Sequence, residues 1–246
     1  MLRAVISLAV FLGLWTLACE LFQVPSYLVP NPLELVEKFW FLTTKADLFS
    51  HIPITVTEIL IGFVIGTFAG VFGSVVFFRV PAVELLLNPV IVFIQTAPKI
   101  AIAPLLLLWL GLDMTPKIVL VAIVTFFPVL SNMLSALRSM NPEFNSLAQI
   151  LCLSPWQRLI RIELPQSLPL LFAGMKVGAT LAVTAAVIGE LMGARGGLGY
   201  LLSLGQETAD VSMVLVSVLL LSLIGYLLSL VIELIEKKYL NWHESV

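Results

Sequence analysis

The sequence predicts an all-α polytopic membrane protein with about six transmembrane helices. Of its 246 residues, 60% are hydrophobic and only 11% are charged, and the mean hydropathy is +1.08. Soluble domains have roughly 45–50% apolar and 25% charged residues, so this composition excludes an ordinary soluble fold. A bilayer core about 30 Å thick needs roughly 20 apolar residues in one helix. Six stretches meet that need, at about 4–22, 54–78, 82–110, 116–137, 167–190 and 211–235.

Charge and cysteine content exclude two kinds of site. A formal net charge of −2, with no run of Lys or Arg, offers no basic surface for nucleic acid. We expect the chain to lie in the lipid bilayer and not to bind nucleic acid. Cys19 and Cys152 lack disulfide or metal-site spacing, and we expect both to be packing residues. The N-terminal run that ends in TLAC resembles a lipoprotein signal peptide. Because Thr16 stands where such a signal has Leu, we expect an uncleaved first span instead.

The spans divide the chain into three regions. Residues 1–50 hold the first span and an outer loop, residues 51–238 form the transmembrane core, and residues 239–246 form a cytoplasmic tail. The third span is too long for one straight crossing, and proline cannot donate the helical hydrogen bond. We therefore expect a kinked or broken helix in that span, which is interrupted by Pro89, Pro98 and Pro104.

Basic residues predict that both termini face the cytoplasm. Cytoplasmic loops of membrane proteins carry an excess of Lys and Arg. With the N-terminus inside, seven basic residues lie on the cytoplasmic side and four outside. The seven are Arg3, Arg79, Arg138, Arg158, Arg161, Lys237 and Lys238, and the four are Lys38, Lys45, Lys117 and Arg195.

Small residues recur every four positions in the second and fifth spans. This spacing puts them on one face of each helix, where two backbones can approach closely. The pattern suits helices that move against each other, and it suits static packing equally well. The expected packing residues are Gly62, Gly66, Gly70, Gly174 and Gly178.

Two short, capped helices are predicted in the cytoplasmic stretch 141–165. Asn141 followed by Pro142 marks the start of the first helix. The sequence SPWQ at 154–157 marks the start of the second, with a Ser cap, a Pro in the first turn, and Gln where a capping box has Glu or Gln. Pro165 is expected to end this helix before the fifth span.

The stretch 141–165 has two physical interpretations. It is either an interfacial hairpin, with Trp156 at the level of the headgroups and the arginines reaching lipid phosphate, or a compact knob that fills a cleft in a soluble partner. Amphipathic spacing suits both.

The same stretch resembles the cytoplasmic coupling motif of ATP-binding-cassette (ABC) importer permeases, E-A-A-x-x-x-G followed nine residues later by I-x-L-P. IELP at 162–165 matches the end of the motif, which aligns Ala148 with its second alanine and Cys152 with its glycine. The branch of the family that it resembles is the nitrate, sulfonate, taurine and pyrimidine-precursor type. The likeness covers about 50–235 and includes QTAPKIAIAPLLLLWLG at 95–111, GMKVGATLAVTAAVIGELMG at 174–193 and GLGYLL at 197–202.

Three positions depart from the motif. Ser146 replaces the Glu, Leu147 replaces the first Ala, and Cys152 replaces the Gly. A cysteine at positive φ would be strained by about 1 kcal/mol or more. Either Cys152 carries this strain, or the turn uses Leu153 and Ser154 instead.

The resemblance implies a type I ABC importer (MetI-like) permease fold in a bacterial-type plasma (inner) membrane. It also implies three partners: a second permease copy, usually an identical one, an ABC ATPase dimer at the cytoplasmic face, and a solute-binding protein at the outer face. The chain lacks G-x-x-x-x-G-K-[ST], so ATP and Mg are expected on the ATPase and no cofactor on this chain. The expected ATPase-coupling residues are Ala148, Leu151, Cys152, Leu153, Ser154, Pro155, Trp156, Leu159 and Pro165.

Ionisable residues inside the spans are candidates for the translocation path, because a charge at mid-bilayer costs about 2.5–3.5 kcal/mol on insertion scales. Gln95 and Lys99 lie where a broken helix would expose backbone groups around a polar cavity. Glu58 and Glu190 either line an outer gate or bond loop backbone. Lys176 is expected to reach the inner headgroups.

The sequence leaves more than one candidate for the transported solute and for the energy source. By resemblance, the solute is a pyrimidine or thiamin precursor, a riboflavin-like molecule, a sulfonate, taurine or nitrate. The main rival function is an ion-coupled secondary transporter, in which Glu58, Lys99 and Glu190 would be ion sites. An enzyme or a metal site is not expected, because His51 and His243, the only histidines, lie at opposite faces.

Overall fold

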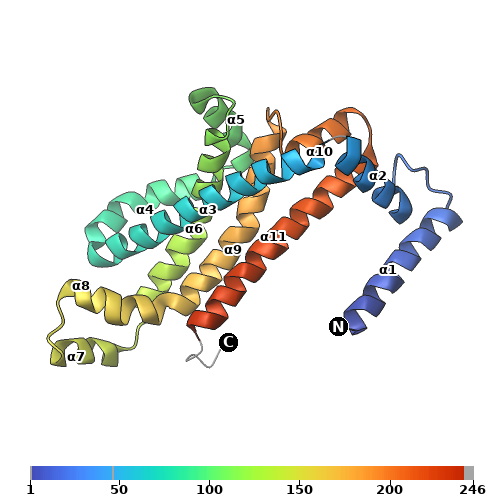
Figure 1. Cartoon of the computed structure of the whole chain (residues 1–246). Helices are drawn as coiled ribbons and strands as arrows, with labels where there is room; N and C mark the ends of the chain where they lie inside the picture. The colour runs from blue at the N-terminus through green and yellow to red at the C-terminus, as the bar shows by residue number, and fades with distance from the viewer. Residues whose placement is uncertain (1, 46, 241–246) are drawn as a thin grey trace. The chain divides into compact units, whose positions relative to one another are not determined.

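The computed structural model of the chain describes residues 2–45 and 47–240 (Figure 1). These residues form helices and contain no strand, so the all-α prediction is confirmed for them. They belong to two compact units, one made of Met1–Val56 with Glu190–Leu223, the other of Thr57–Gly189 with Ile224–Val246. From residue 241 onward, the predicted cytoplasmic tail, including His243, lies outside the described residues.

Within the described residues, four helices are long and apolar enough to cross a membrane. A fifth crossing is possible if one bent pair of helices, α4 (Pro81–Thr96) and α5 (Lys99–Leu110), counts as a single span. The sequence-based count of six and the predicted orientation stay predictions. The four helices are α3 (Leu48–Arg79), α6 (Thr115–Arg138), the continuous helix Pro155–Leu191, which contains α9 (Leu164–Leu191), and α11 (Val211–Tyr239).

The predicted break in the third span is confirmed. α4 and α5 meet at an angle of 100°. Of the three prolines, Pro98 lies at the break, where its missing N–H leaves the helix without a hydrogen bond, and Ala97 before it has left the helical region at ψ 136°. Pro89 and Pro104 lie inside α4 and α5.

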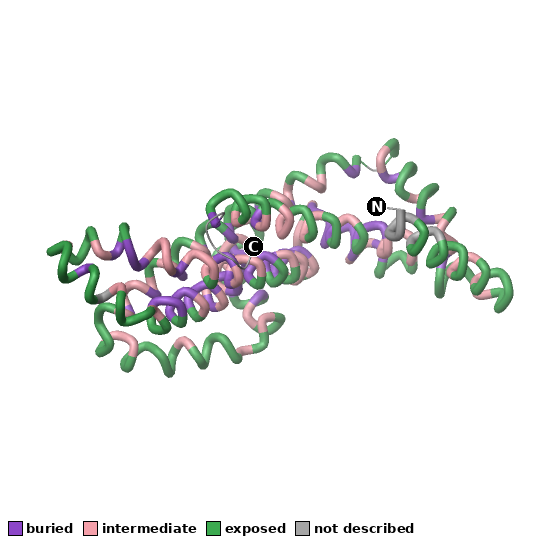
Figure 2. The backbone as a smooth tube through the Cα atoms, turned by 90° about the horizontal axis from the view of Figure 1, so that it is seen from below, coloured by how far each residue is buried: buried purple, intermediate pink, exposed green. Residues whose placement is uncertain are grey.

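The larger unit packs around α6, which has the largest buried share of the four long apolar helices. The glycines of α3 and α9 contact this helix with their backbones. A Cβ at Gly66 would lie 2.5 Å from the carbonyl oxygen of Ala122, and one at Gly174 would lie 2.9 Å from that of Pro128. Figure 2 shows buried positions alternating with exposed ones along most helices, as is typical of helices that also face lipid or partners.

The smaller unit contains α1 (Leu2–Leu21), α2 (Pro32–Lys45) and α10 (Leu198–Glu207). Three side chains cap the start of α10. The backbone N–H groups of residues 197, 198 and 199 donate to the Nδ1 atom of His51, the Oγ1 atom of Thr55 and the carboxylate of Glu190. Side-chain acceptors of this kind satisfy the N–H groups that a helix start leaves free.

The expected end of the second short helix at Pro165 is wrong. α8 (Pro155–Arg158) continues through a π-helical turn, η1 (Leu159–Glu163), directly into α9. In that turn the N–H of Leu164 reaches back five residues to the carbonyl of Leu159. A π turn widens the helix, so it can accommodate a proline ring that would otherwise clash with the carbonyl four residues before it.

Candidate functional site

The stretch 141–165, called the knob below, consists of α7 (Pro142–Ile150), α8 and η1 (yellow in Figure 1). Both predicted caps are present. The Asn141 side chain accepts from the N–H of Glu143 at 3.0 Å. Ser154 and Gln157 form a capping box, each accepting from the other's backbone N–H. These caps fix the start of each short helix through residues of the stretch itself.

The turn between α7 and α8 uses Cys152 at φ 46°. Cysteine therefore takes the conformation in which the coupling motif has glycine, at the steric cost that a Cβ brings there. Leu153 and Ser154 do not take over this role, because Ser154 lies in the extended region at φ −65° and Leu153 has no positive φ.

The knob carries large apolar side chains that the described part of the chain leaves exposed. Ile150, Leu151 and Trp156 are 78%, 56% and 68% exposed. In contrast, Ala148 of α7 and Leu159 of η1 are buried. Exposed apolar side chains on a rigid element mark a surface for a partner or a membrane.

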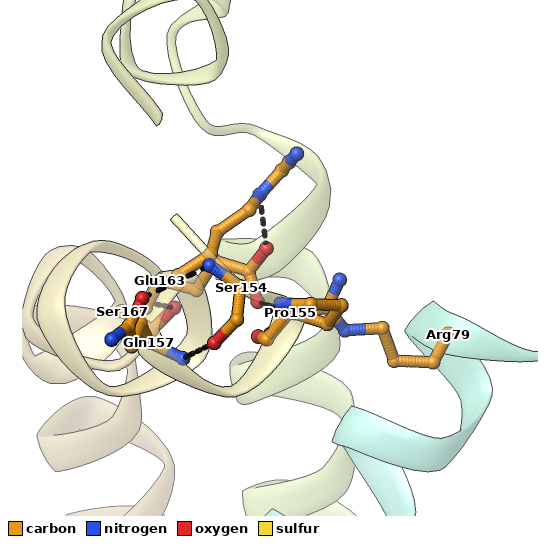
Figure 3. Close-up of polar contacts among 7 residues, drawn as sticks. Arg79, Ser154, Pro155, Gln157, Glu163 and Ser167 are labelled. Atoms are coloured by element: carbon orange, nitrogen blue, oxygen red, sulfur yellow. Dashed lines mark hydrogen bonds and ion pairs between the residues drawn. The ribbon is translucent and has the colours of Figure 1, made fainter. Parts of the chain in front are cut away.

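A buried carboxylate ties the knob to the end of α3, as the close-up in Figure 3 shows. Glu163 is fully buried and accepts from Nη2 of Arg79 at 2.6 Å and from Nε of Arg158 at 2.7 Å. Arg79 also donates to the carbonyl of Pro155 at 3.2 Å, and Ser167 donates to the carbonyl of Glu163. The two arginines neutralise the charge that burial would otherwise disfavour.

A cavity of about 570 Å³ lies in the larger unit, beside the break between α4 and α5. Its volume is in the range of about 300–1,000 Å³ that small-molecule sites occupy. Nine of its fourteen lining residues are apolar, among them Phe127 and Leu181. The other five are Gln95, Lys99, Ser131, Asn132 and Thr184.

The break positions the two predicted path residues at this cavity. Gln95 lies near the end of α4 and Lys99 begins α5. The ammonium of Lys99 donates to the backbone carbonyl of Gln95 at 2.5 Å, a carbonyl that a continuous helix would have paired with a backbone N–H. Both predicted residues line the cavity, and their role in transport stays a prediction.

The two other predicted path residues do not line this cavity. Glu58 is fully buried and pairs with Lys117 of α6 at 2.8 Å. Glu190 accepts from the hydroxyl of Thr55 at 2.6 Å and from the N–H of Gly199 at the start of α10. For Glu190, this geometry fits the loop-bonding alternative better than a gate.

Sequence reasoning missed the partners of two buried carboxylates. Lys117 was expected outside the membrane but is buried in α6 against Glu58. A signal for this pair exists: Glu58 precedes Gly62 by four residues, so it shares the glycine face of α3 that contacts α6. Glu163 lies inside the I-x-L-P match, where the motif allows any residue, and nothing in the sequence marks Arg79 as its partner.

The described residues contain no group of three or more His, Cys, Asp or Glu side chains that could hold a metal ion. The described geometry offers instead an exposed apolar surface on the knob and a cavity of a size that suits a small solute.

Comparison with known proteins finds relatives that match nearly the whole chain. The chain is 31% identical to the riboflavin transport system permease protein RibX of Chloroflexus aurantiacus, covering 98% of this chain and 90% of the relative. It is 28% identical to the putative aliphatic sulfonates transport permease protein SsuC of Bacillus subtilis, covering 96% and 86%. It is 31% identical to the formylaminopyrimidine transport permease protein ThiX of Halalkalibacterium halodurans, covering 94% and 92%.

The fold has a solved counterpart. An inward-facing structure of the MetNI methionine ABC transporter aligns with a TM-score of 0.62 at 19% identity, over 82% of this chain and 98% of that one. Residues 49–241 match the family described as binding-protein-dependent transport system inner membrane component. The chain is therefore a multi-pass, non-enzymatic transport subunit of the inner membrane, and it belongs to this family of ABC importer permeases.

Proposed function

We propose that this permease works in an ATP-driven importer, in which a separate ATPase dimer grips the knob and a second permease copy completes the translocation path. A binding protein delivers the solute. The candidate solutes are those that its relatives' names give, formylaminopyrimidine, riboflavin, an aliphatic sulfonate or taurine, together with nitrate.

The observation that carries the proposal is the exposed apolar surface of a knob whose two short helices are both capped at their starts. Ile150 ends α7, Leu151 follows it and Trp156 lies in α8. Arg79 of α3 holds the α8–η1 part through the carbonyl of Pro155 and the carboxylate of Glu163. An interfacial hairpin needs apolar contact with lipid but no rigid attachment, because lipid adapts to any orientation. A docking element that transmits force needs both an apolar contact surface and a firm attachment to the rest of the permease.

The ATPase, and not the membrane, is the partner that this proposal names. A photocrosslinking amino acid in place of Leu151 is expected to crosslink to the ATPase in membranes of cells that express the whole importer. The same amino acid in place of Leu219 of α11 is the control, since both leucines are 56% exposed and Leu219 lies on a helix apolar enough to span the membrane. Crosslinks from both positions to lipid alone would contradict the proposal.

The energy source is tested separately. Uptake of solute is expected to stop when ATP is depleted while the proton gradient is maintained. Uptake that continues under these conditions, and stops when the proton gradient is collapsed, would contradict ATP coupling and favour the ion-coupled alternative.

A further inference from the structure

The cavity beside the α4–α5 break has a single charge. Among the described residues that line it, Lys99 alone is ionised, and no carboxylate accompanies it. We propose that this cavity binds an organic anion with an apolar body, and that Lys99 is the counter-charge of its acidic group. This inference rests on the proposed permease function and names the class of solute that the path accepts.

Lys99 differs from Lys117 and Lys176, two other lysines on the apolar helices of this unit. Lys117 pairs with Glu58, and Lys176 of α9 pairs with Glu236 of α11. The ion pairs of the described part of the chain include none to Lys99. A cation within a membrane span is disfavoured unless protein, water or a ligand compensates it. At Lys99 the protein supplies a carbonyl, which accepts a hydrogen bond but carries no opposite charge.

The ammonium has donors left for a ligand. It has three N–H groups, and the bond to the carbonyl of Gln95 uses one of them. The other two can meet the oxygens of a sulfonate, carboxylate or phosphate group in a charge-assisted bond. An organic cation would be repelled by the same charge.

The remaining lining defines the rest of the ligand. Nine apolar residues, including Phe127, Val177 and Leu181, surround most of the cavity. Their contact favours an aliphatic or aromatic body, because apolar surface is removed from water there. Ser131 and Thr184 add hydroxyl groups for a few polar atoms. A small inorganic anion such as nitrate would leave this apolar surface unused.

The test measures binding of three probes of similar size to the full-length permease in lipid nanodiscs. The probes are 2-naphthalenesulfonate, the neutral 2-naphthalenesulfonamide and the cationic 2-naphthylmethylammonium. The variants are Lys99→Met, Lys99→Arg and Gln95→Glu, with Lys237→Met as a control, since Lys237 is an exposed lysine outside the cavity.

We expect the sulfonate to bind most tightly to the unaltered chain. Its Kd is expected to rise by about tenfold or more in Lys99→Met, to stay within a few-fold in Lys99→Arg, and to be unchanged in Lys237→Met. Gln95→Glu should weaken binding of the sulfonate and strengthen binding of the cationic probe, because it places a carboxylate beside Lys99. Binding of the sulfonamide should not respond to Lys99→Met.

Equal binding of the sulfonate and sulfonamide, or sulfonate binding that does not respond to Lys99→Met, would overturn the proposal and indicate simple partition into an apolar cavity. The permease function is read separately, as ATP-dependent uptake by the whole importer. Uptake that the sulfonate does not inhibit would refute the solute class alone. Loss of ATP dependence, with Lys99-dependent sulfonate binding retained, would refute the proposed energy source alone.

Discussion

Replacement of Glu163 by glutamine is expected to loosen the knob from α3 without unfolding it. Glu163 holds Arg79 with one carboxylate oxygen and Arg158 with the other. Glutamine keeps the size and one carbonyl oxygen, so it can still accept from one arginine, but its NH₂ group faces the donors of the second. The capping box of Ser154 and Gln157 does not involve Glu163, so α8 should keep its start.

The free energy lost in Glu163→Gln can be estimated from these hydrogen bonds. A hydrogen bond to a charged group contributes about 1.5–3 kcal/mol. Arg79 and Arg158 are 32% and 28% exposed, so water can solvate them after release and recover part of the lost energy. We expect a net loss of about 2 kcal/mol, which shifts the balance between the attached and the loosened knob by about 30-fold.

The assay measures transport and ATP hydrolysis in the same proteoliposomes, which contain the permease with its ATPase. The solute moved per ATP hydrolysed is expected to fall by about tenfold or more in Glu163→Gln. The amount of bound ATPase and its rate of hydrolysis should stay close to those of the unaltered complex, because the exposed surface of the knob is unchanged.

The matched control is Glu233→Gln, which removes the same charge from an exposed pair with Lys237, one turn apart on α11. Exposed pairs of this kind contribute little, so transport per ATP should not change. An unchanged ratio in Glu163→Gln would refute the reasoning, as would an equal loss in the control.

Three further predictions concern the partner surface, a buried ion pair and helix packing. Trp156→Ala is expected to weaken binding of the ATPase while leaving membrane insertion intact, because the exposed ring is a large part of the apolar surface of the knob. Normal co-purification of the ATPase with the variant, together with normal transport, would argue against this. Lys117→Met is expected to lower the unfolding free energy by about 3–5 kcal/mol, because it removes the cation that pairs with a fully buried Glu58. In thermal melting, the double variant Lys117→Met/Glu58→Leu should regain most of that loss. If the single variant melts like the unaltered chain, the ion pair has no such role. Gly66→Val is expected to separate α3 from α6 and abolish stable expression, since its Cβ would overlap a backbone carbonyl, whereas Gly13→Val, whose Cβ meets nothing within 4 Å, should express normally.

The sequence predicts best those features that depend on local chemistry. The break near Pro98 and the caps at Asn141 and Ser154 each follow from a few adjacent residues, and the structure contains all three. Of the six predicted apolar stretches, four are long apolar helices and a fifth is the bent pair α4 and α5. Pro165 was mispredicted because its effect depends on the π turn before it, which has no simple sequence signature.

Contacts between distant segments are harder to predict. The bonds of Glu163 to Arg79 and of Glu58 to Lys117 join residues 84 and 59 positions apart. Periodicity shows which face of a helix a residue occupies but not which helix lies opposite. For Glu58, the glycine face narrows the choice to the helix that packs against α3. For Glu163, no such face exists, because η1 interrupts the regular helical register.

The helical continuity that the sequence did not predict links the two candidate sites. Trp156 of the knob and Thr184 of the cavity lie on the one continuous helix Pro155–Leu191. At about 1.5 Å per residue, roughly 42 Å of helix separates them. A helix transmits a tilt along its length more effectively than a loop does, because each residue is held by backbone hydrogen bonds. Had Pro165 ended the helix, as the sequence suggested, movement of the knob would reach the cavity through a flexible joint. In the continuous helix, displacement of Trp156 by a partner must move α9, and with it one wall of the cavity, unless the π turn at 159–163 absorbs the change. The attachment of Glu163 to Arg79 opposes that absorption, because it joins the π turn to the end of α3.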